Sequence, residues 1–581
     1  MNPFDPILDQ PQSIDHDHAD RSARYRLANQ DIYFDVDTRT DLHDLVWPWA
    51  DALYVRSIRL QITDPQHDEL MALVTRYFPG YQETILGNDG MIISKRLAAP
   101  LSSAYDRAVL WMLDCQAEGD RLIRLDVEID WGEPLTQRMV DGLLVAQRNP
   151  EGARGIYAQH NAESTRVFGN PQGRPTAFQL DAAGRAQLTY FILVNGMVEV
   201  PLLLTLSDVG EQVAWNGFLG LRDAERAFEL SAEAWERAVK TGRLWTSDPR
   251  INRAVQTGRL AAVRSVQRLR TGLAPSGRRV TDVPTLVAAL DAFDVTSSRN
   301  LLAHVRRVAE RSGGRLPPHL PVRPKDELEE PGRTLAANNS AYLTALLQHL
   351  QRHPDAELLA EHYGAVSAVA EALVQLRWQA QNQADAVTYA VSGVGLRQAV
   401  TLATLQKDGV NAVRWESEAC ELERLAEEAG APPPPAPISV EHWASETGWQ
   451  LRPERPWSFA NPLAGAALAG SMVWTACGLQ RRNGKLWVYP KRANPWRWWA
   501  LVDLPTEVSA TGSDRITLVW DGATLYTTRP VQSDQPVAVC SRIRVLHTDE
   551  LDFRLEFELT PAAEHGAPGE RRLFRPIFDT A

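Results

Sequence analysis

Hydrophobic and polar residues alternate with a period of two over most of the chain from residue 25 to residue 230. Segments such as ETILGNDGMIISKRLA and QLTYFILVNGMVEVPLLLTL are rich in β-branched residues and contain the turn-forming triplets NDG and VNG. Alternation interrupted by such turns is typical of antiparallel hairpins. The pattern therefore predicts an antiparallel β-sandwich over residues 25–243, and the polar segment 1–24 is expected to be a flexible tail.

The hydrophobic period changes to 3.6 between residues 244 and 430, which is the spacing of one helix face. Ser247 or Asp248 is suited to cap the first helix, and Pro249 to occupy its opening turn. We therefore expect a domain of helical hairpins over residues 244–430. Its helices are expected near residues 248–270, 283–294, 297–311, 333–353, 356–381, 384–405 and 409–429.

A proline-rich segment, APPPPAP, occupies residues 431–437 and cannot continue a helix. Such a segment is typical of a stiff polyproline linker. After it the period of two returns in GKLWVYPKR and DRITLVWDGATLYTTRP, which predicts a small C-terminal β-domain over residues 438–581. The expected fold class is therefore multidomain α+β, in the order β-sandwich, helical hairpins and β-domain.

Charge and hydropathy narrow the class of partner. The chain has 581 residues and a net charge of -12. Because phosphate contacts need clustered Lys and Arg, this charge argues against nucleic acid and anionic membranes as partners. No apolar run reaches the roughly 18 residues of a membrane-spanning helix. The first residues, MNPFDPILDQ, lack the basic and apolar regions of a signal peptide, so we expect a cytoplasmic protein with an uncharged partner.

Neither a metal ion nor an organic cofactor is expected. The four cysteines lie far apart, so they form neither a disulfide framework nor a CxxC metal site. The segment DHDHAD offers His16, His18 and Asp20 to a metal, but its place in a polar tail favours a solvated segment. SGVGLR does not follow a strand and is therefore not a dinucleotide-binding loop.

The order of these regions carries a family resemblance. AFELSAEAWERAVKTGRLWTSDPRINRAVQTGRLAAV stands at the junction of sandwich and helices, and TDVPTLVAALDAFDVTSSRNLLAHVRRVAERSGGRLPPHL follows as a helical hairpin. The chain resembles the six-hairpin glycosidases, whose helices form an (α/α)6 toroid and which include glucoamylase-like, amylo-α-1,6-glucosidase-like and glycosyl-phosphorylase-like proteins. The resemblance implies a carbohydrate-active protein that acts on or binds an α-glucan or a related oligosaccharide or polysaccharide.

The resemblance also implies where the sugar binds. Such enzymes use two carboxylates, one as general acid and one that activates water. Many members carry an Arg-Asp pair that grips a sugar hydroxyl, for which Arg279 and Asp282 are the nearest match as substrate-binding residues. Glu327 and Glu330, in the acidic loop before Pro331, are the candidate catalytic residues. Carboxylates at a helix start are also favoured by the helix dipole, so a solvated helix start is the alternative.

Tryptophans provide a second kind of sugar-binding candidate. Trp496 and Trp498 in NPWRWWALVDLP would share one face of a strand, where flat indoles can stack on sugar rings. Burial in the β-domain core is the alternative, because large aromatic side chains mostly serve as core. The dipeptide Trp415-Glu416 resembles the general-acid loop of the family, but its helical spacing favours an exposed helix position for Glu416.

The helical region is short for a complete toroid. Twelve helices and their loops need roughly 250–300 residues, more than residues 244–430 supply. We therefore expect a partial toroid without a complete pair of catalytic carboxylates. Three alternatives stay open: an active glycoside hydrolase or phosphorylase, a pseudoenzyme that serves as a carbohydrate-binding module, and a structural subunit.

A partial toroid leaves one apolar helical flank to be covered. Within the chain the candidate is the segment 438–477, which contains Trp443, Trp449, Trp457 and Trp474 and is expected to form an aromatic lid. Part of it, ANPLAGAALAGSMVWTAC, is a candidate for a single further helix. We expect a monomer, and a partner chain over the open edge is the alternative.

Overall fold

The structure is a computed structural model in which the chain divides into two compact units. The described residues up to Arg237 form the first, here called the sandwich unit, and those from Ala238 onward form the second, here called the helical unit. The structure describes residues 12–15, 24–49, 52–67, 69–101, 105–148, 164–320, 332–379, 386–431, 462–482, 485–491, 496–509, 512–548, 553–559 and 571–575.

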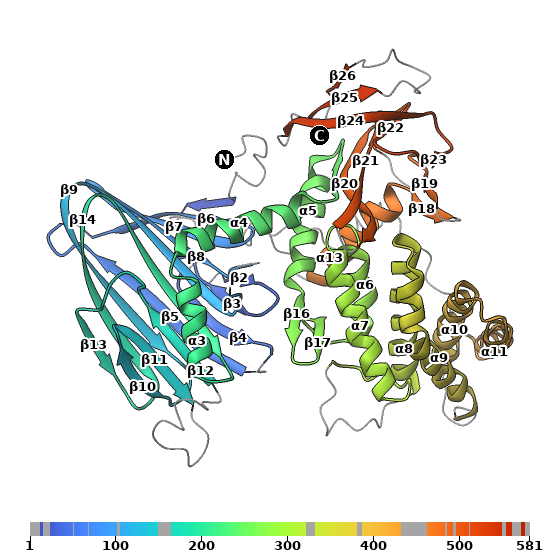
Figure 1. Cartoon of the computed structure of the whole chain (residues 1–581), viewed down its shortest axis with the longest axis horizontal. Coiled ribbons are helices and arrows are strands. Elements are labelled where there is room, and N and C mark those ends of the chain that lie inside the picture. Colours follow the sequence, from blue (N-terminus) through green and yellow to red (C-terminus); the bar gives the residue numbers. More distant parts are fainter. Residues whose placement is uncertain are drawn as a thin grey trace. The chain divides into compact units, whose positions relative to one another are not determined.

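The sandwich unit is built around two long antiparallel strands, β9 (Ala108–Asp130) and β14 (Arg185–Ser207) (Figure 1). The first half of β9 pairs with β8 and the second half with β5, so the two strands run through both arms of one 14-stranded sheet. One arm contains β1 (Gln12–Asp15), β6 (Met71–Tyr77), β7 (Tyr81–Asn88), β8 (Met91–Ala98), β12 (Ser164–Gly169), β11 (Leu143–Arg148) and β10 (Thr136–Val140). The other contains β2 (Tyr25–Ala28), β3 (Tyr33–Val36), β4 (Leu42–Trp47), β5 (Ala52–Thr63) and β13 (Ala177–Leu180).

The core of the sandwich unit follows from the alternation in its strands. Ile58, Leu60 and Ile62 of β5 are buried, and the polar residues between them are not. Helix α3 (Glu211–Gly220) packs on β12 and β14, and Phe218 joins a hydrophobic cluster that also includes Phe228 of α4 (Ala224–Lys240). The large antiparallel β-region predicted for this part of the chain is confirmed.

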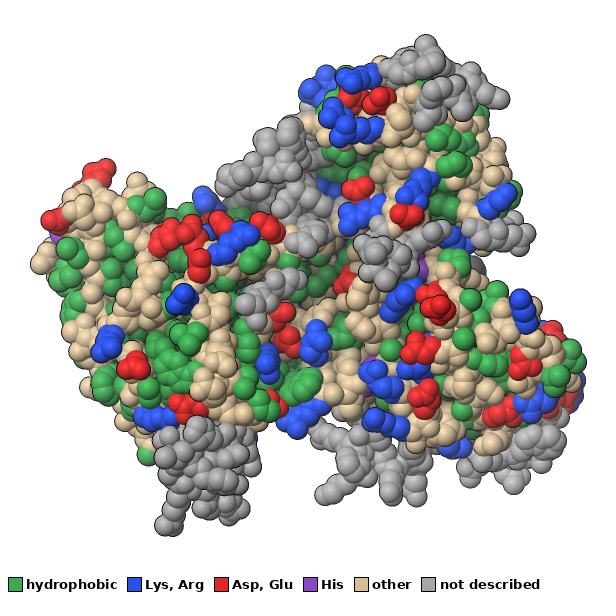
Figure 2. Space-filling view, viewed as in Figure 1, with side chains coloured by type: hydrophobic (Ala, Val, Ile, Leu, Met, Phe, Trp, Pro, Cys, Tyr) green, Lys and Arg blue, Asp and Glu red, His purple; other side chains and the backbone are tan. Residues whose placement is uncertain are grey.

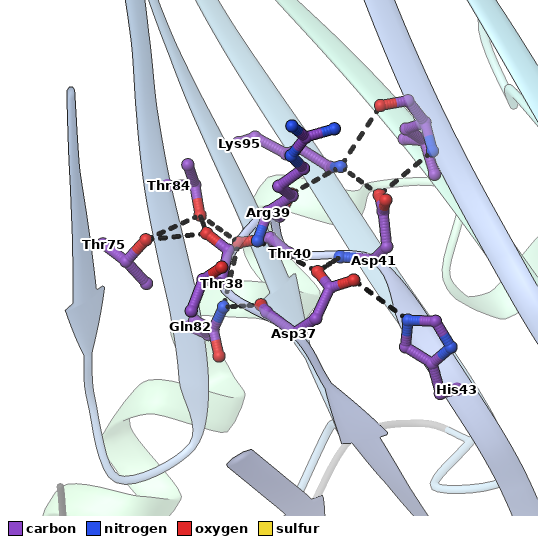
Figure 3. Close-up of polar contacts among 11 residues, drawn as sticks. Asp37, Thr38, Arg39, Thr40, Asp41, His43, Thr75, Gln82, Thr84 and Lys95 are labelled. Atoms are coloured by element: carbon purple, nitrogen blue, oxygen red, sulfur yellow. Dashed lines mark hydrogen bonds and ion pairs between the residues drawn. The ribbon is translucent and has the colours of Figure 1, made fainter. Parts of the chain in front are cut away.

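A buried lysine is held by the turn between β3 and β4 (Figure 3). The Lys95 ammonium donates to Asp41 Oδ1 at 2.6 Å, to the Arg39 carbonyl at 2.8 Å and to the Leu60 carbonyl at 3.3 Å. These three bonds use all the protons of the ammonium group, as a buried charge requires. Lys95 therefore stabilises the fold and has no donor left for a ligand.

The carboxylate of Asp37 organises the same turn (Figure 3). It accepts hydrogen bonds from the His43 ring at 3.0 Å and from the amides of Arg39 and Asp41 at 2.9 and 3.0 Å. Burial alone would raise the pKa of Asp37, but these donors lower it to about 2. The ionised carboxylate thus belongs to the folded state of this turn.

The helical unit contains hairpins in which α6, α8 and α10 pack side by side, with α7, α9 and α11 against them. These helices are α5 (Pro249–Arg264), α6 (Val283–Leu290), α7 (Val295–Arg311), α8 (Gly332–Arg352), α9 (Ala356–Gln379), α10 (Ala386–Gln406) and α11 (Gly409–Glu428). The helix expected near 248–270 ends at Arg264, so this expectation is wrong at its carboxyl end. Strand β16 (Val266–Leu269) follows instead and pairs with β17 (Gly272–Pro275), because Val266 and Leu269 are buried in that hairpin.

Helix α13 (Pro462–Ser471) packs against both α5 and α6. Glycines permit the close approach, since a Cβ atom on Gly258 of α5 would lie 2.2 Å from the carbonyl oxygen of Gly465. The π-helix η3 (Met472–Ala476) follows, and Trp474 donates from its indole nitrogen to the Ala288 carbonyl at 3.1 Å. Residues 462–471 of the segment expected to form a further helix therefore do form one. Of the aromatic lid, Trp443, Trp449 and Trp457 lie outside the described residues.

A seven-stranded sheet completes the helical unit. Its strands, in spatial order, are β15 (Arg243–Thr246), β20 (Trp499–Ser509), β21 (Gly512–Trp520), β22 (Leu525–Thr527), β24 (Val537–Thr548), β25 (Phe553–Leu559) and β26 (Arg571–Phe574). Strand β15 immediately precedes α5, so the segment that leads into the helices is itself the edge of the C-terminal sheet. A smaller sheet contains β18 (Leu479–Arg482), β19 (Lys485–Val488) and β23 (Gln532–Ser533). The α+β fold class is confirmed.

The surface carries charges of both signs. Figure 2 shows acidic and basic side chains interspersed over the helices α8 to α11 on the face in view. A single-sign field of the kind that attracts nucleic acid is not seen on that face. Among the described residues, no helix has the length and hydrophobicity required to cross a membrane.

Candidate functional site

The candidate site lies at the amino end of α6. The β16–β17 hairpin leads into a tight turn in which the Arg278 amide donates to the Pro275 carbonyl at 2.7 Å. Arg278 has a φ of 57°, a left-handed conformation that is uncommon for a residue other than glycine. Strained backbone of this kind is often found at functional sites, where the surrounding structure holds it. After this turn come Arg279, the single 3-10 turn η1 (Val280–Asp282) and α6.

His319 lies beside Arg279 in an antiparallel bridge. The Val280 amide donates to the Pro318 carbonyl at 3.1 Å, and the Leu320 amide donates to the Arg278 carbonyl at 2.7 Å. The side chains of Arg279 and His319 are both exposed. Two basic side chains therefore stand together at this end of the helices. Sequence reasoning missed His319, because PPHL resembles an ordinary loop and is remote from Arg279 along the chain.

Asp282 occupies the N-cap position of α6 without capping it. An aspartate here usually accepts a hydrogen bond from the first helical turn, but the Asp282 side chain makes no such bond. It forms no hydrogen bond or ion pair with any other described residue. Burial raises the pKa of the half-buried carboxyl, and the positive charges of Arg279 and His319 oppose that rise. The site thus holds a partly desolvated carboxylate with unused acceptors beside a guanidinium group and an imidazole ring.

The structure brings together two of the predicted site residues, Arg279 and Asp282. The other two polar candidates, Glu327 and Glu330, lie outside the described residues. The described ends of the chain on either side of them lie close to the site. Leu320 is bonded to Arg278, and α8, which starts at Gly332, contacts η1.

The overall fold was compared with known proteins. Neither a protein-family model nor a curated protein matches the chain. The chain is similar to the solved structure of a protein named as a kojibiose phosphorylase from the human microbiome, with a TM-score of 0.57 and 8% sequence identity over 97% of this chain and 98% of that one. The chain therefore shares the overall fold of that protein.

Two further solved structures match over smaller parts of the chain. One is a family GH92 inverting mannosidase from Bacteroides thetaiotaomicron, with a TM-score of 0.44 and 11% identity over 69% of this chain and 62% of that one. The other is a GH78 family rhamnosidase from a Bacillus species, with a TM-score of 0.38 and 11% identity over 74% of this chain and 53% of that one. All three neighbours are carbohydrate-active proteins by name.

Trp496 and Trp498 lie just before β20, which begins at Trp499, so the prediction that they share one face of a strand is wrong, and both take buried positions. The side chains of Trp496 and Trp498 are 7% and 4% exposed. Trp498 packs in one cluster with Trp245 and Phe557, and its ring meets that of Phe574 edge to face at 5.9 Å. Their exposed area is too small to offer an indole face to a sugar ring. The alternative interpretation, in which both tryptophans are buried in the core, therefore agrees with the structure.

Trp415 and Glu416 lie on α11 as their spacing indicates. Trp415 is fully buried and donates to Glu371 at 2.9 Å. Glu416 is 47% exposed at its side chain and pairs with Arg397. This pair lies on the surface of the helical unit and is unconnected with Asp282.

A buried charged network, absent from the sequence prediction, lies at the carboxyl end of α6. Asp291 accepts from His349 Nδ1 at 2.7 Å and from Arg352 Nη1 at 3.2 Å, and the Asp291 carbonyl accepts from His353 Nε2 at 2.9 Å. Although burial alone would raise it, the pKa of Asp291 is held well below its usual range, with His349 the largest lowering influence. Burial lowers the pKa of His353 to about 4. Asp291 directly follows α6, and its partners His349 and Arg352 belong to α8. We therefore assign this network the structural role of joining the two helices.

The part of the chain that the structure describes contains no candidate metal site. Among the described residues, no cluster of three or more His, Cys, Asp or Glu side chains has the geometry to hold a metal. Cys115, Cys477 and Cys540 are buried, and burial raises the pKa of each thiol. His16, His18 and Asp20 lie outside the described residues.

Proposed function

We propose that the helical unit binds an oligosaccharide at the amino end of α6 and acts on its glycosidic bond. The observation that carries this proposal is Asp282, which stands at a helix N-cap but leaves its acceptors unused beside Arg279 and His319. A charged acceptor that is partly desolvated forms stronger hydrogen bonds than one in water. Sugar hydroxyls can donate to such a carboxylate while accepting from the neighbouring guanidinium.

The roles within the site divide between binding and catalysis. Asp282 and Arg279 would hold sugar hydroxyls, as the resemblance to six-hairpin glycosidases implies. Glu327 and Glu330 would supply the general acid and the second carboxylate. In hydrolysis that second carboxylate activates water. In phosphorolysis, inorganic phosphate takes the place of water, and one carboxylic acid is sufficient to protonate the leaving oxygen.

An α-linked glucan or a related oligosaccharide is the proposed substrate. The glycosidase-like fold supports a carbohydrate ligand, and the chain's resemblance to glucoamylase-like and phosphorylase-like proteins supports an α-linked one. Binding without turnover is the alternative, in which the chain is a pseudoenzyme that serves as a carbohydrate-binding module.

A turnover assay separates these functions. The full chain would be incubated with kojibiose and with maltohexaose, with and without inorganic phosphate, while new reducing ends and sugar phosphate are measured. We expect turnover of at least one of the two, and we expect Glu327→Gln and Glu330→Gln each to abolish it without loss of binding. Binding without turnover in the unmodified protein would establish the pseudoenzyme instead, and the absence of both would refute the proposal.

We propose that the protein is a monomer. Helix α13 covers apolar surface of α5 and α6 that would otherwise need a partner chain. Light scattering of the full chain should then give the mass of one 64.8 kDa chain, and a stable dimer would contradict this.

A further inference from the structure

A cavity of about 630 Å³ opens in the helical unit at the carboxyl end of α8, beside η3 and the β18–β19 hairpin. A volume of this size suits a small organic ligand rather than a single ion. The cavity lies on the same side as the carboxyl end of α6, because Arg352 reaches Asp291 from its wall, whereas Asp282 starts α6 at the other end. Its lining residues are Gln348, Gln351, Arg352, Trp474, Thr475, Gly478, Leu479, Gln480, Arg481 and Leu486.

The polar side chains that line the cavity are either positively charged or neutral. They include the guanidinium groups of Arg352 and Arg481. The side-chain amides of Gln348, Gln351 and Gln480 also line the cavity. No carboxylate is among the described residues that line the cavity. Guanidinium groups present several N–H donors in a plane and match the oxygens of a phosphate. The lining therefore selects for an anionic ligand.

The side chain of Arg352 is fixed by contacts with Asp291 and Trp474. Its Nη1 donates to Asp291 Oδ2 at 3.2 Å, and its guanidinium lies 5.3 Å from the centre of the Trp474 ring. The same ring meets His353 edge to face at 6.0 Å. Nε and Nη2 of Arg352 make no hydrogen bond with a described residue. A ligand can thus use these donors without the cost of ordering a mobile side chain.

Arg481 lines the cavity from a different element. It belongs to β18 and donates from Nη2 to the Thr506 carbonyl of β20. This contact fixes the position of the guanidinium group at the wall of the cavity.

We propose that this cavity binds a phosphorylated monosaccharide, with the phosphate between Arg352 and Arg481 and the sugar hydroxyls at the glutamine amides. Phosphate is favoured over a neutral sugar because of the two guanidinium groups. A sugar phosphate is favoured over free phosphate because the volume and the three amides exceed what one phosphate group fills. The proposal is independent of the function proposed for Asp282, because it uses a different set of residues at the other end of α6.

Calorimetric titration of the full chain tests this inference. The probes are glucose 6-phosphate, glucose 1-phosphate, inorganic phosphate and glucose, each at low and high salt. We expect at least one sugar phosphate to bind at least tenfold more tightly than inorganic phosphate, glucose not to bind, and affinity to fall as salt rises. Equal affinity for phosphate and both sugar phosphates would overturn the sugar part of the proposal, and no binding of any anion would overturn it entirely.

Surface variants locate the site without disturbing the fold. Gln351 is exposed and lines the cavity, so Gln351→Glu places a negative charge beside the phosphate and should weaken binding at least tenfold. The matched control is Gln375→Glu, which adds the same charge at an exposed position of α9 outside the cavity and should change nothing. Equal effects of the two variants would overturn the proposal.

A third variant keeps this inference separate from the proposed function. Asp282→Asn should leave the affinity for the sugar phosphate unchanged. If Asp282→Asn abolishes binding while Gln351→Glu does not, the sugar phosphate binds at the amino end of α6 and the cavity proposal is wrong.

Discussion

Arg279 and His319 lie opposite each other on two antiparallel backbone segments. Hydrogen bonds from Val280 to Pro318 and from Leu320 to Arg278 flank the pair. The loop before α6 is therefore fixed to the chain that leads towards α8, and the side chains of both loops are brought to one end of the helices. This arrangement places the Asp282 carboxylate beside the Arg279 guanidinium and the His319 ring, which is the basis of the proposed saccharide site.

The Asp282 carboxylate should reduce stability at neutral pH. Its folded pKa is raised above the unfolded value, so ionisation is less favourable in the folded protein. This cost is present above the folded pKa and disappears as the pH falls below the unfolded one. We therefore expect Asp282→Asn to raise the Tm at pH 7 and to have little effect near pH 3, as measured by calorimetry. A lower Tm for the variant at pH 7 would show that the carboxylate has a structural role.

The buried Lys95 should be essential to the sandwich unit. Lys95→Met removes the charge that faces Asp41 and takes away the ammonium donor from that carboxylate and from two carbonyls. Breaking a buried pair in this manner costs about 3–5 kcal/mol. We expect a large drop in the midpoint of urea unfolding, and no comparable drop for Lys485→Met, which changes an exposed lysine of β19. Equal midpoints for the two variants would contradict the role given to Lys95.

Asp37 should make the stability depend on pH in the acid range. Its folded pKa of about 2 lies below the unfolded value near 3.9. The stabilisation is thus complete above about pH 4 and is lost as the pH falls towards 2. We expect wild type to exceed Asp37→Asn in Tm at pH 6, with the gap closing as the pH approaches 2. A gap that stays constant over this range would show that the charge of Asp37 is not involved.

The crossing of α5 with α13 should not tolerate a side chain at Gly258 of α5. A Cβ atom on Gly258 would meet the Gly465 carbonyl oxygen at 2.2 Å, so Gly258→Ala forces the two backbones apart. Such overpacking costs about 1–3 kcal/mol. Gly364 of α9 is the control, because nothing lies within 4 Å of the Cβ that Gly364→Ala adds. We expect thermal unfolding to show a loss of stability for the first variant and a gain of about 0.4–1 kcal/mol for the second.

Periodicity was sufficient to predict the order of sheet, helices and sheet. It failed where tertiary contacts decide the local structure. Residues 266–269 continue the helical spacing of α5, but the burial of Val266 and Leu269 against β17 favours a strand. The alternation around Trp496 and Trp498 predicts that both lie on one face of a strand, but β20 begins only at Trp499, and both side chains are buried ahead of it.

The candidate site was predictable only in part, because its contacts are remote in sequence. Arg279 and Asp282 could be named only through the resemblance to six-hairpin glycosidases, many of which carry an Arg-Asp pair at the first hairpin. His319 could not, since only the backbone bridge brings it to Arg279. The Asp291–His349 pair joins residues 58 positions apart and matches no spacing rule.

Calorimetric titration of maltohexaose into wild type, Asp282→Asn and Asp294→Asn is the measurement that tests the central claim most directly. Asp294 caps α7 through the Ser297 amide at 3.1 Å, and asparagine caps a helix equally well. The account predicts that wild type and Asp294→Asn bind alike and that Asp282→Asn loses more than about 1 kcal/mol of binding free energy, the scale of a hydrogen bond to a charged group. Equal affinity of all three proteins would contradict the assignment of the saccharide site to the amino end of α6.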